Sequence, residues 1–222
     1  MTTPSTKNLT LPDSPHMDAP DPKGRLFAPS AARNMAPIVD LVSTYAPKRG
    51  KALEIASGTG EHCTALARAL PQIHWQPTEP EAVRRASIDG HSEGISNMAP
   101  AIPLDAAAVD WSAQHGGQDL ILLVNLLHLI PAPSAQTIIT ESARALNAGG
   151  HFIFYGPFLR GGQPTSDGDA RFHASLRAQD PTIGYKDVEE IESWIAEAGL
   201  KLIARVDMPA NNLAFVTKRE HP

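Results

Sequence analysis

Strand-like and helix-like patterns of apolar residues alternate along most of this chain. Short apolar runs, which are typical of buried strands, cover residues 51–56, 73–77, 101–104, 119–130 and 151–158. Between them, apolar residues recur every three or four positions, as on one face of a helix, over 61–70, 80–88 and 134–150. Strands that alternate with helices predict βαβ units and a parallel sheet covered by helices on both faces.

The two ends of this region add further elements. One helix is predicted over 31–45, and another follows Asp187 and is stopped by Gly199. Two strand patterns, 200–208 and 213–218, are joined by a link too short for a parallel crossover, so we expect an antiparallel hairpin. The pattern predicts a doubly wound, Rossmann-like α/β sandwich of three layers, with a mostly parallel sheet and an antiparallel C-terminal strand.

Composition limits the domain organisation. The chain has 222 residues, of which 42% are apolar, enough for one full core. Residues 1–24 are rich in Pro, Thr, Ser and Asp, so we expect a disordered tail, followed by a single domain over 25–222. The N-terminus has no apolar targeting segment, and no apolar run is long enough to span a membrane. We therefore expect a cytoplasmic protein without a membrane partner.

Charge and cysteine content exclude further classes. The formal net charge is −5, and no dense Lys/Arg cluster is present, which argues against a nucleic-acid partner. The one cysteine, Cys63, precludes a disulfide within the chain, and the nine histidines are scattered singly, so no metal site is expected. The pattern leaves a small molecule as the expected partner, and the oligomeric state stays open.

A glycine turn follows the first predicted strand. In LEIASGTGEH, residues 53–62, apolar residues give way to Gly-Thr-Gly and then to helix formers. Gly58 and Gly60 lack a Cβ, so the backbone can turn tightly and approach a ligand beside the unpaired N–H groups of the next helix. A dinucleotide fingerprint needs a third glycine where Cys63 stands, which disfavours NAD(P). A tight turn without a ligand remains the alternative.

Acidic residues occur in three successive strand regions. Glu54 lies within the first, and Glu79 follows the second, where a carboxylate can accept two ribose hydroxyls. Asp105 follows the third, where it can accept a hydrogen bond from an exocyclic amine. Each of them alone is better explained as a solvated loop carboxylate. Together with the glycine turn, they favour a ligand with hydroxyls, an amine and positive charge, and S-adenosyl-L-methionine has these groups.

In these segments the sequence resembles class I S-adenosylmethionine-dependent methyltransferases. LEIASGTG resembles their first motif, with Ala56 where glycine is commoner, WQPTE resembles the ribose-binding strand end, and Leu104-Asp105 resembles the adenine-binding turn. The resemblance implies a seven-stranded sheet and S-adenosyl-L-methionine as cofactor. Residues and resemblance together give as expected cofactor contacts Arg33, Glu54, Ala56, Ser57, Gly58, Gly60, Glu79, Asp105, Ala106 and Asn125.

A narrower resemblance covers Arg25 to Lys218. The segments RLFAPSAARNMAPI, WQPTE, YGPF, SLRAQDP and MPANN are similar to a methyltransferase-like family of bacteria and animals known as a domain of unknown function. His173 and Lys186 stand where that family has Asp and Arg. These departures leave the cofactor motifs intact, and they make any substrate carried over from the family doubtful.

Methyl transfer demands alignment more than a fixed set of catalytic groups. His128 follows the fourth predicted strand and is the best candidate for a base, although a histidine packed between helices explains it equally well. Tyr155 is a second candidate catalytic residue, and Asn211 and Asn212 are candidates for binding the substrate. Arg33 could pair with the cofactor carboxylate.

A long segment, residues 156–184, separates the last parallel strand from the helix after Asp187. Only one short helix, around residues 169–177, is expected in it. Loops of this length are lids or disordered segments, and Phe158 and Phe172 give this one apolar contacts for a substrate. We therefore interpret it as a substrate lid.

Three classes of function remain open. A methyltransferase for a small molecule explains both the cofactor motifs and the lid. A protein that binds the cofactor without catalysis and acts through a partner fits the same motifs. An NAD(P)-dependent oxidoreductase is disfavoured, because the third glycine and a Tyr-x-x-x-Lys pair are missing.

Overall fold

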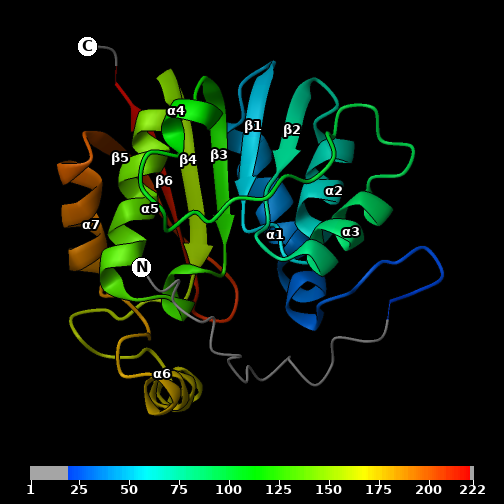
Figure 1. Ribbon diagram of the computed structural model, residues 1–222. Coiled ribbons are helices and arrows are strands. Elements are labelled where there is room, and N and C mark those ends of the chain that lie inside the picture. The colour runs from blue at the N-terminus through cyan, green and yellow to red at the C-terminus, as the bar shows by residue number, and fades with distance from the viewer. Residues whose placement is uncertain (1–19, 221–222) are drawn as a thin grey trace.

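The computed structural model describes residues 20–220, and these contain a six-stranded sheet (Figure 1). The order across the sheet is β2-β1-β3-β4-β6-β5. β1 to β4 are parallel, whereas β6 runs antiparallel to both β4 and β5. The predicted hairpin and the mostly parallel sheet are confirmed. The strands are β1 (Gly50–Ile55), β2 (Ile73–Pro77), β3 (Gln118–Val124), β4 (Leu146–Gly156), β5 (Leu200–Asp207) and β6 (Leu213–Arg219).

The implied count of seven strands is not confirmed, because residues 101–104 form no regular strand. This segment follows β2 through isolated bridges, which pair Trp75 with Met98 and Thr78 with Ile102. Pro100 and Pro103 have no N–H to donate, so a continuous ladder cannot form there. The segment therefore covers the edge of β2 and brings the chain to Asp105.

Helices cover both faces of the sheet. Strand residues alternate between two cores, so Ile121 and Phe154 belong to one and Leu122 and Ile153 to the other. The first core is closed by α5 and α7, the second by α1, α2 and α3. The helices are α1 (Pro29–Tyr45), α2 (Glu61–Ala69), α3 (Ala82–His91), α4 (Ser112–His115), α5 (Ala132–Ala145), α6 (Asp167–Gln179) and α7 (Val188–Glu197).

Two predicted boundaries are wrong in an informative way. The apolar run 119–130 is not one strand, because β3 ends at Val124 and Asn125 takes a left-handed conformation with φ 57°. The helix predicted over 134–150 ends at Ala145, because Leu146 is extended and pairs with Gln118 in the sheet. Gly149 and Gly150 therefore lie in the first, irregular part of β4.

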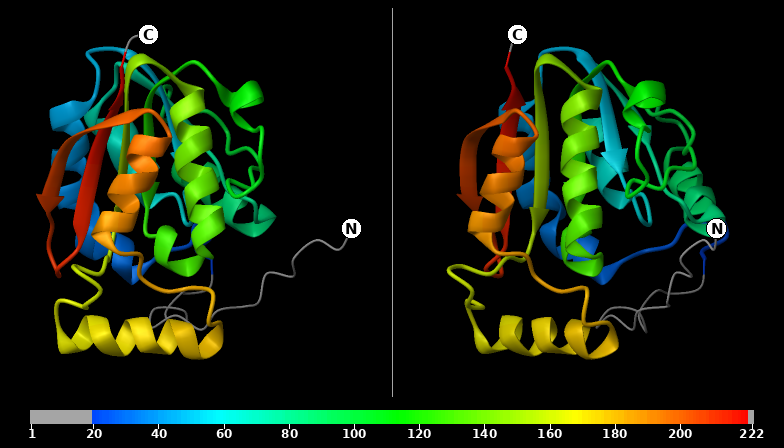
Figure 2. Two further views of the ribbon diagram at one scale, coloured as in Figure 1. Left: turned by 90° about the vertical axis from the view of Figure 1, so that its left-hand side faces the viewer. Right: turned by 60° about the vertical axis from the view of Figure 1, so that its left-hand side comes forward.

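The long segment after β4 crosses the carboxyl end of the parallel strands. α6, 13 residues long, lies beneath the tips of β3 and β4 in Figure 1 and runs across that end of the sheet in Figure 2. The segment returns to the main body where the Leu159 N–H donates to the Lys186 carbonyl at 3.0 Å. Ligands bind at this end of doubly wound sheets, so α6 is placed over the expected site.

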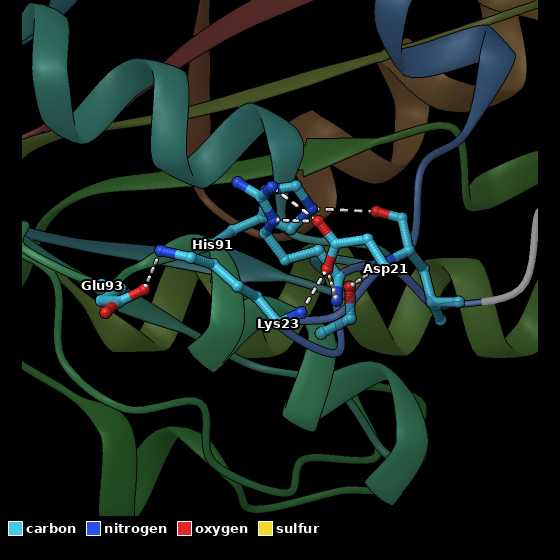
Figure 3. A network of polar contacts seen from close by, with 7 residues as sticks. Asp21, Lys23, His91 and Glu93 are labelled. Carbon is cyan, nitrogen blue, oxygen red and sulfur yellow. Dashed lines mark hydrogen bonds and ion pairs between the residues drawn. The ribbon is translucent and has the colours of Figure 1, made fainter.

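Residues 20–28 are held against α3 before α1 begins. The Asp21 carboxylate accepts the backbone N–H groups of Lys23 and Arg25 and pairs with the Arg25 guanidinium at 2.6 Å, while Lys23 contacts Glu93 (Figure 3). His91 contacts the Leu26 carbonyl at 2.9 Å. Most of the predicted tail, residues 1–19, lies outside the described residues. Within residues 20–220, no helix is both long and apolar enough to cross a membrane.

Candidate functional site

A cavity of about 650 Å³ opens at the carboxyl end of the parallel strands. Its walls come from the start of α1, the turn after β1, the ends of β2 and β3, α6 and the β5–β6 turn. Ligand cavities of this size and position are typical of doubly wound folds. Of the residues predicted as functional, those that line it are Arg33, Glu54, Ala56, Ser57, Gly58, Glu79, Asn125, His128, Phe172 and Asn212.

The turn after β1 has an unusual backbone conformation. Ala56 has φ 51° and Gly58 has φ 59°, both in the left-handed region. A non-glycine residue there costs about 1–3 kcal/mol and is found most often at functional sites. Glu79, which follows β2, holds the turn in this conformation, because the Gly58 N–H donates to its Oε2 at 3.1 Å. The backbone of this turn is therefore presented to the cavity in one arrangement.

Gly60 serves packing rather than the cavity wall. A Cβ at this position would lie 2.8 Å from the Ile88 Cα, so only glycine allows α2 to start so close to α3. Its φ of 98° also favours glycine. The predicted contact between Gly60 and a cofactor stays a prediction, and the structure gives the residue a separate physical reason.

Two buried carboxyl groups face the half of the cavity that is lined by the turn after β1 and the end of β2, which we call its first half. Burial raises the pKa of Glu54 to about 7, and within residues 20–220 its Oε2 is buried and has no hydrogen-bond partner. Glu79 is 3% exposed, and burial raises its pKa as well. Its two oxygens accept backbone N–H groups of Gly58 and Glu81. Glu54 thus has an unused acceptor atom in a place where a cationic group would be stabilised.

Aromatic rings form the second half of the cavity. His128 lies edge to face with Phe172 at 5.8 Å and with Tyr185 at 6.0 Å between ring centroids. Leu126, Leu129 and Pro157 add apolar surface. Burial and the positive charge of Lys186 lower the pKa of His128 to about 3, so its imidazole is neutral at physiological pH. This half can hold a ring and offers one neutral nitrogen base.

Lys186 joins the loop of His128 to the end of the long segment. Its ammonium donates to the carbonyls of Ile130 and Gly184, and the Gly184 N–H donates to the His128 carbonyl at 3.0 Å. Burial lowers the pKa of Lys186 to about 8. Lys186 therefore fixes the position of His128 through two backbone contacts.

Tyr155 is buried outside the cavity lining and belongs to a chain of polar groups. Its hydroxyl is hydrogen-bonded to Asn34 and Asn212, and burial raises its pKa. Asn34 Oδ1 in turn contacts His62 Nε2 at 2.7 Å, and burial lowers the pKa of His62 to about 4. Tyr155 thus connects α1, which lines one half, to the β5–β6 turn, which lines the other.

The remaining predicted residues lie away from the cavity lining. Asp105 caps its own turn by accepting the Ala107 N–H at 3.0 Å, and Ala106 is in the core. Phe158 is 2% exposed and packs against Phe154 and Phe215 in the main core. A role of Asp105 and Ala106 toward adenine stays a prediction, whereas Phe158 would reach a substrate only if the core opened.

Several lining residues escaped the sequence analysis. Asn211 was predicted, but Asp169, to which its side-chain amide donates at 3.1 Å, was not. The spacing of Ser166 and Asp169, which matches a capping box, was a usable signal for a fixed carboxylate at the start of α6. Tyr185 follows a glycine in the returning segment and carries no local signal of a binding role. Its place depends on the tertiary fold.

Comparisons with known proteins agree with the fold. A family model described as "Protein of unknown function (DUF938)" matches residues 25–219. An O-methyltransferase family protein from Burkholderia thailandensis is similar, with a TM-score of 0.72 and 19% identity over 86% of this chain and 57% of that one. A putative O-methyltransferase from Nostoc punctiforme has a TM-score of 0.73 and 21% identity, over 85% of this chain and 56% of that one.

A structure described as PigF with SAH has a TM-score of 0.69 and 24% identity, over 86% of this chain and 63% of that one. The chain therefore spans less than two thirds of the length of these solved relatives. These similarities show that the chain shares its fold with solved O-methyltransferases.

Proposed function

We propose that this chain, which belongs to the DUF938 family of proteins of unknown function, is an S-adenosyl-L-methionine-dependent methyltransferase that acts on the hydroxyl group of a small molecule. The observation that carries the proposal is a single cavity with two different halves. One half has the strained glycine turn and two buried carboxyl groups, and the other has aromatic rings around one neutral histidine. The fold shared with O-methyltransferases supports this reading.

The residues of the first half fit the cofactor. Glu54 has a buried oxygen without a partner among residues 20–220, and a cationic amino group would supply one. The Glu79 carboxylate uses one lone pair of each oxygen on backbone N–H groups and has others for two ribose hydroxyls. When bound, S-adenosyl-L-methionine supplies an electrophilic methyl group on a positively charged sulfur.

His128 accepts the proton of the acceptor hydroxyl in the proposed reaction. The hydroxyl oxygen would take the methyl group that the cofactor supplies, the bonding electron pair would stay with the cofactor, and the imidazole would hold the proton. Burial makes His128 a weak base in the empty protein. The charge that the imidazole gains replaces the charge that sulfur loses, so the number of positive charges in the cavity is unchanged. This balance makes the transfer compatible with a buried site.

The long segment excludes water from the second half of the cavity, where the acceptor would bind and which we call the acceptor half. Leu176, Ile183 and Tyr185 form a small core of their own, against which Leu129 and Phe172 pack. We assign residues 156–184 as a lid that closes over the acceptor, supported by this core and by the position of α6. Excluding water protects the developing charges and keeps the reactants aligned.

Calorimetry tests the first step of this function. S-adenosylmethionine and S-adenosylhomocysteine should bind with micromolar affinity, whereas NAD should not bind. Transfer of a tritiated methyl group to small phenols should then follow. A preference for NAD would contradict the proposal, and cofactor binding without transfer to any acceptor would favour a binding protein that acts through a partner.

A further inference from the structure

Asp169 is a charged residue in the acceptor half that the reaction does not use. It is the third residue of α6, and together with Gly168 and Phe172 it lines the cavity. The other residues that line this half, Leu126, Leu129, Pro157 and Phe172 among them, are mostly apolar. A carboxylate in such a setting affects strongly which molecules can bind.

The contacts of Asp169 separate its two oxygens. Oδ2 accepts the hydroxyl of Ser166 at 2.6 Å, that of Thr165 at 3.0 Å and the amide of Asn211 at 3.1 Å. These three bonds start α6 and attach it to the β5–β6 turn. Oδ1 accepts the Tyr185 hydroxyl at 3.3 Å, a longer bond than the other three. Capping the helix therefore accounts for Oδ2, and Oδ1 retains capacity to accept another donor.

The negative charge of Asp169 is stabilised by neutral groups. All four donors are hydroxyls or an amide, and their hydrogen bonds hold the pKa of Asp169 below its ordinary value. Two basic residues of the neighbouring segments have other partners: Lys186 donates to two carbonyls, and Arg160 pairs with Asp207 at 3.3 Å. The carboxylate is thus ionised and has no cation at its side in these contacts.

We propose that the acceptor is an aromatic molecule with a positively charged amino group, and that Asp169 binds this group and so sets the substrate class. His128, Phe172 and Tyr185 contact one another edge to face, so the ring of the acceptor would lie against this cluster, with its hydroxyl toward the imidazole. A carboxylate on the same acceptor would be repelled by Asp169 and leave both charges without a partner. This inference rests on the proposed function, because it describes the acceptor of that reaction.

Three phenols of matched size test the inference. Tyramine, tyrosol and 4-hydroxyphenylacetate share the ring and differ at the end of the side chain, which is an ammonium, a hydroxyl or a carboxylate. Calorimetry with and without saturating S-adenosylhomocysteine gives their affinities for the full chain. We expect tyramine to bind about tenfold to a hundredfold more tightly than 4-hydroxyphenylacetate, the range for hydrogen bonds to a charged group, with tyrosol between them.

The variant Asp169→Asn should remove this preference. The amide keeps an acceptor oxygen for the start of α6. The affinity for tyramine should fall by about the same tenfold to hundredfold, and the affinity for 4-hydroxyphenylacetate should rise, because the negative charge is gone. The matched control is Asp167→Asn, an exposed carboxylate in the same turn, which should retain the preference. Thermal unfolding and the affinity for S-adenosylmethionine, both unchanged in Asp169→Asn, would show that the fold and the cofactor half are intact.

The outcomes separate this inference from the proposed function. Failure of S-adenosylhomocysteine to bind would contradict the proposed function. Equal affinities for the three phenols, no binding of tyramine, or an unchanged preference in Asp169→Asn would overturn the role of Asp169. A loss of S-adenosylmethionine affinity in Asp169→Asn would also overturn it, because the carboxylate would then serve the cofactor.

Discussion

At the scale of single residues, Glu79 joins the backbone of the glycine turn to the cavity. Its carboxylate accepts the Gly58 N–H at 3.1 Å and lines the cavity, in the half where we propose that the cofactor binds. We expect Glu79→Ala to weaken cofactor binding by about 1.5–3 kcal/mol, or roughly tenfold to a hundredfold, because hydrogen bonds to a charged group are lost. Calorimetry with S-adenosylhomocysteine measures this change.

The control for that measurement is Glu93→Ala. Glu93 is an exposed carboxylate that pairs with Lys23, away from the cavity lining, so the same change in net charge should leave affinity unaltered. If the folded Glu79→Ala variant bound as tightly as its parent, Glu79 would be only a structural cap for the turn.

His128 leads to a prediction about pH. Burial and Lys186 lower its pKa to about 3, so the imidazole is already neutral over the range in which an exposed histidine titrates. Turnover should therefore show no loss of rate near pH 6.5 that depends on His128. Replacement by Asn should lower the rate of methyl transfer about a hundredfold or more, the contribution typical of a general base, and leave cofactor affinity unchanged.

Rate profiles of the parent and of His128→Asn between pH 5 and 9 check this prediction. An acidic limb with a midpoint near 6.5 in the parent that vanishes in the variant would mean that His128 is exposed to solvent during turnover. A variant that retains the full rate would place the base elsewhere.

Sequence patterns were informative about residues whose role is local. Gly58 and Glu79 follow strand ends, and the parallel arrangement of β1 and β2 brings them together as the spacing indicated. Phe158 was predicted as a lid contact but packs in the main core, because an aromatic residue after a strand can point into either. Asp169 and Tyr185 meet only because α6 and the returning segment pack together, a contact between residues 16 positions apart that no local pattern contains.

At the scale of elements, the sequence predicted the alternation of strands and helices correctly, but it did not predict where each element ends. The run 101–104 has the composition of a strand, but Pro100 before it and Pro103 within it cannot donate to a ladder. The end of β3 depends on the left-handed Asn125, whose N–H donates to the Tyr155 carbonyl across the sheet at 2.9 Å. Both outcomes follow from neighbouring strands, which a single segment does not reveal.

The lid is the element with the clearest functional prediction. Its base is held by the pairing of Leu159 with Lys186 and Val188, so residues 161–184 can be replaced by a short Gly-Ser linker that keeps this pairing. We expect methyl transfer to be abolished, since water enters and the acceptor loses the contacts of Phe172 and Asp169. Cofactor affinity should be nearly unchanged, because the proposed cofactor contacts lie in the other half of the cavity.

Hydrogen exchange on the intact chain gives an independent readout. With cofactor bound, adding an acceptor that is turned over should increase protection in residues 161–184. No added protection there, or full activity in the shortened chain, would contradict the lid.

At the scale of the whole molecule, Glu54 connects stability to cofactor binding. Its carboxyl is buried in the sheet at the centre of the domain, with its pKa raised to about 7 from an ordinary 4.5. Between these two pH values the folded chain keeps a proton that the unfolded chain has lost. Stability therefore falls as pH rises from 4.5 to 7, by about 3 kcal/mol in total from this group.

Buried histidines act in the opposite direction. The pKa values of His62 and His128 lie at about 4 and about 3 in the folded chain, so below pH 6.5 the unfolded chain binds protons that the folded one does not. Their contribution to stability is therefore lost as pH falls. The parent protein alone cannot separate the two effects, and comparison with Glu54→Gln isolates the carboxyl group.

We expect Glu54→Gln to be more stable than the parent at pH 8, by up to about 3 kcal/mol, and close to it at pH 4.5, where the parent carboxyl is protonated in the folded chain and half protonated in the unfolded one. The same variant should bind S-adenosylmethionine more weakly, because a neutral amide no longer attracts its cationic groups. In the parent, the affinity for S-adenosylmethionine should rise with pH through about 7, as Glu54 ionises, and in the variant it should not.

Urea unfolding measures the stability difference and calorimetry measures the cofactor affinity, each at pH 4.5, 6 and 8. A stability difference that does not vary with pH would mean that Glu54 titrates normally in the folded chain, and its buried oxygen would then have another partner.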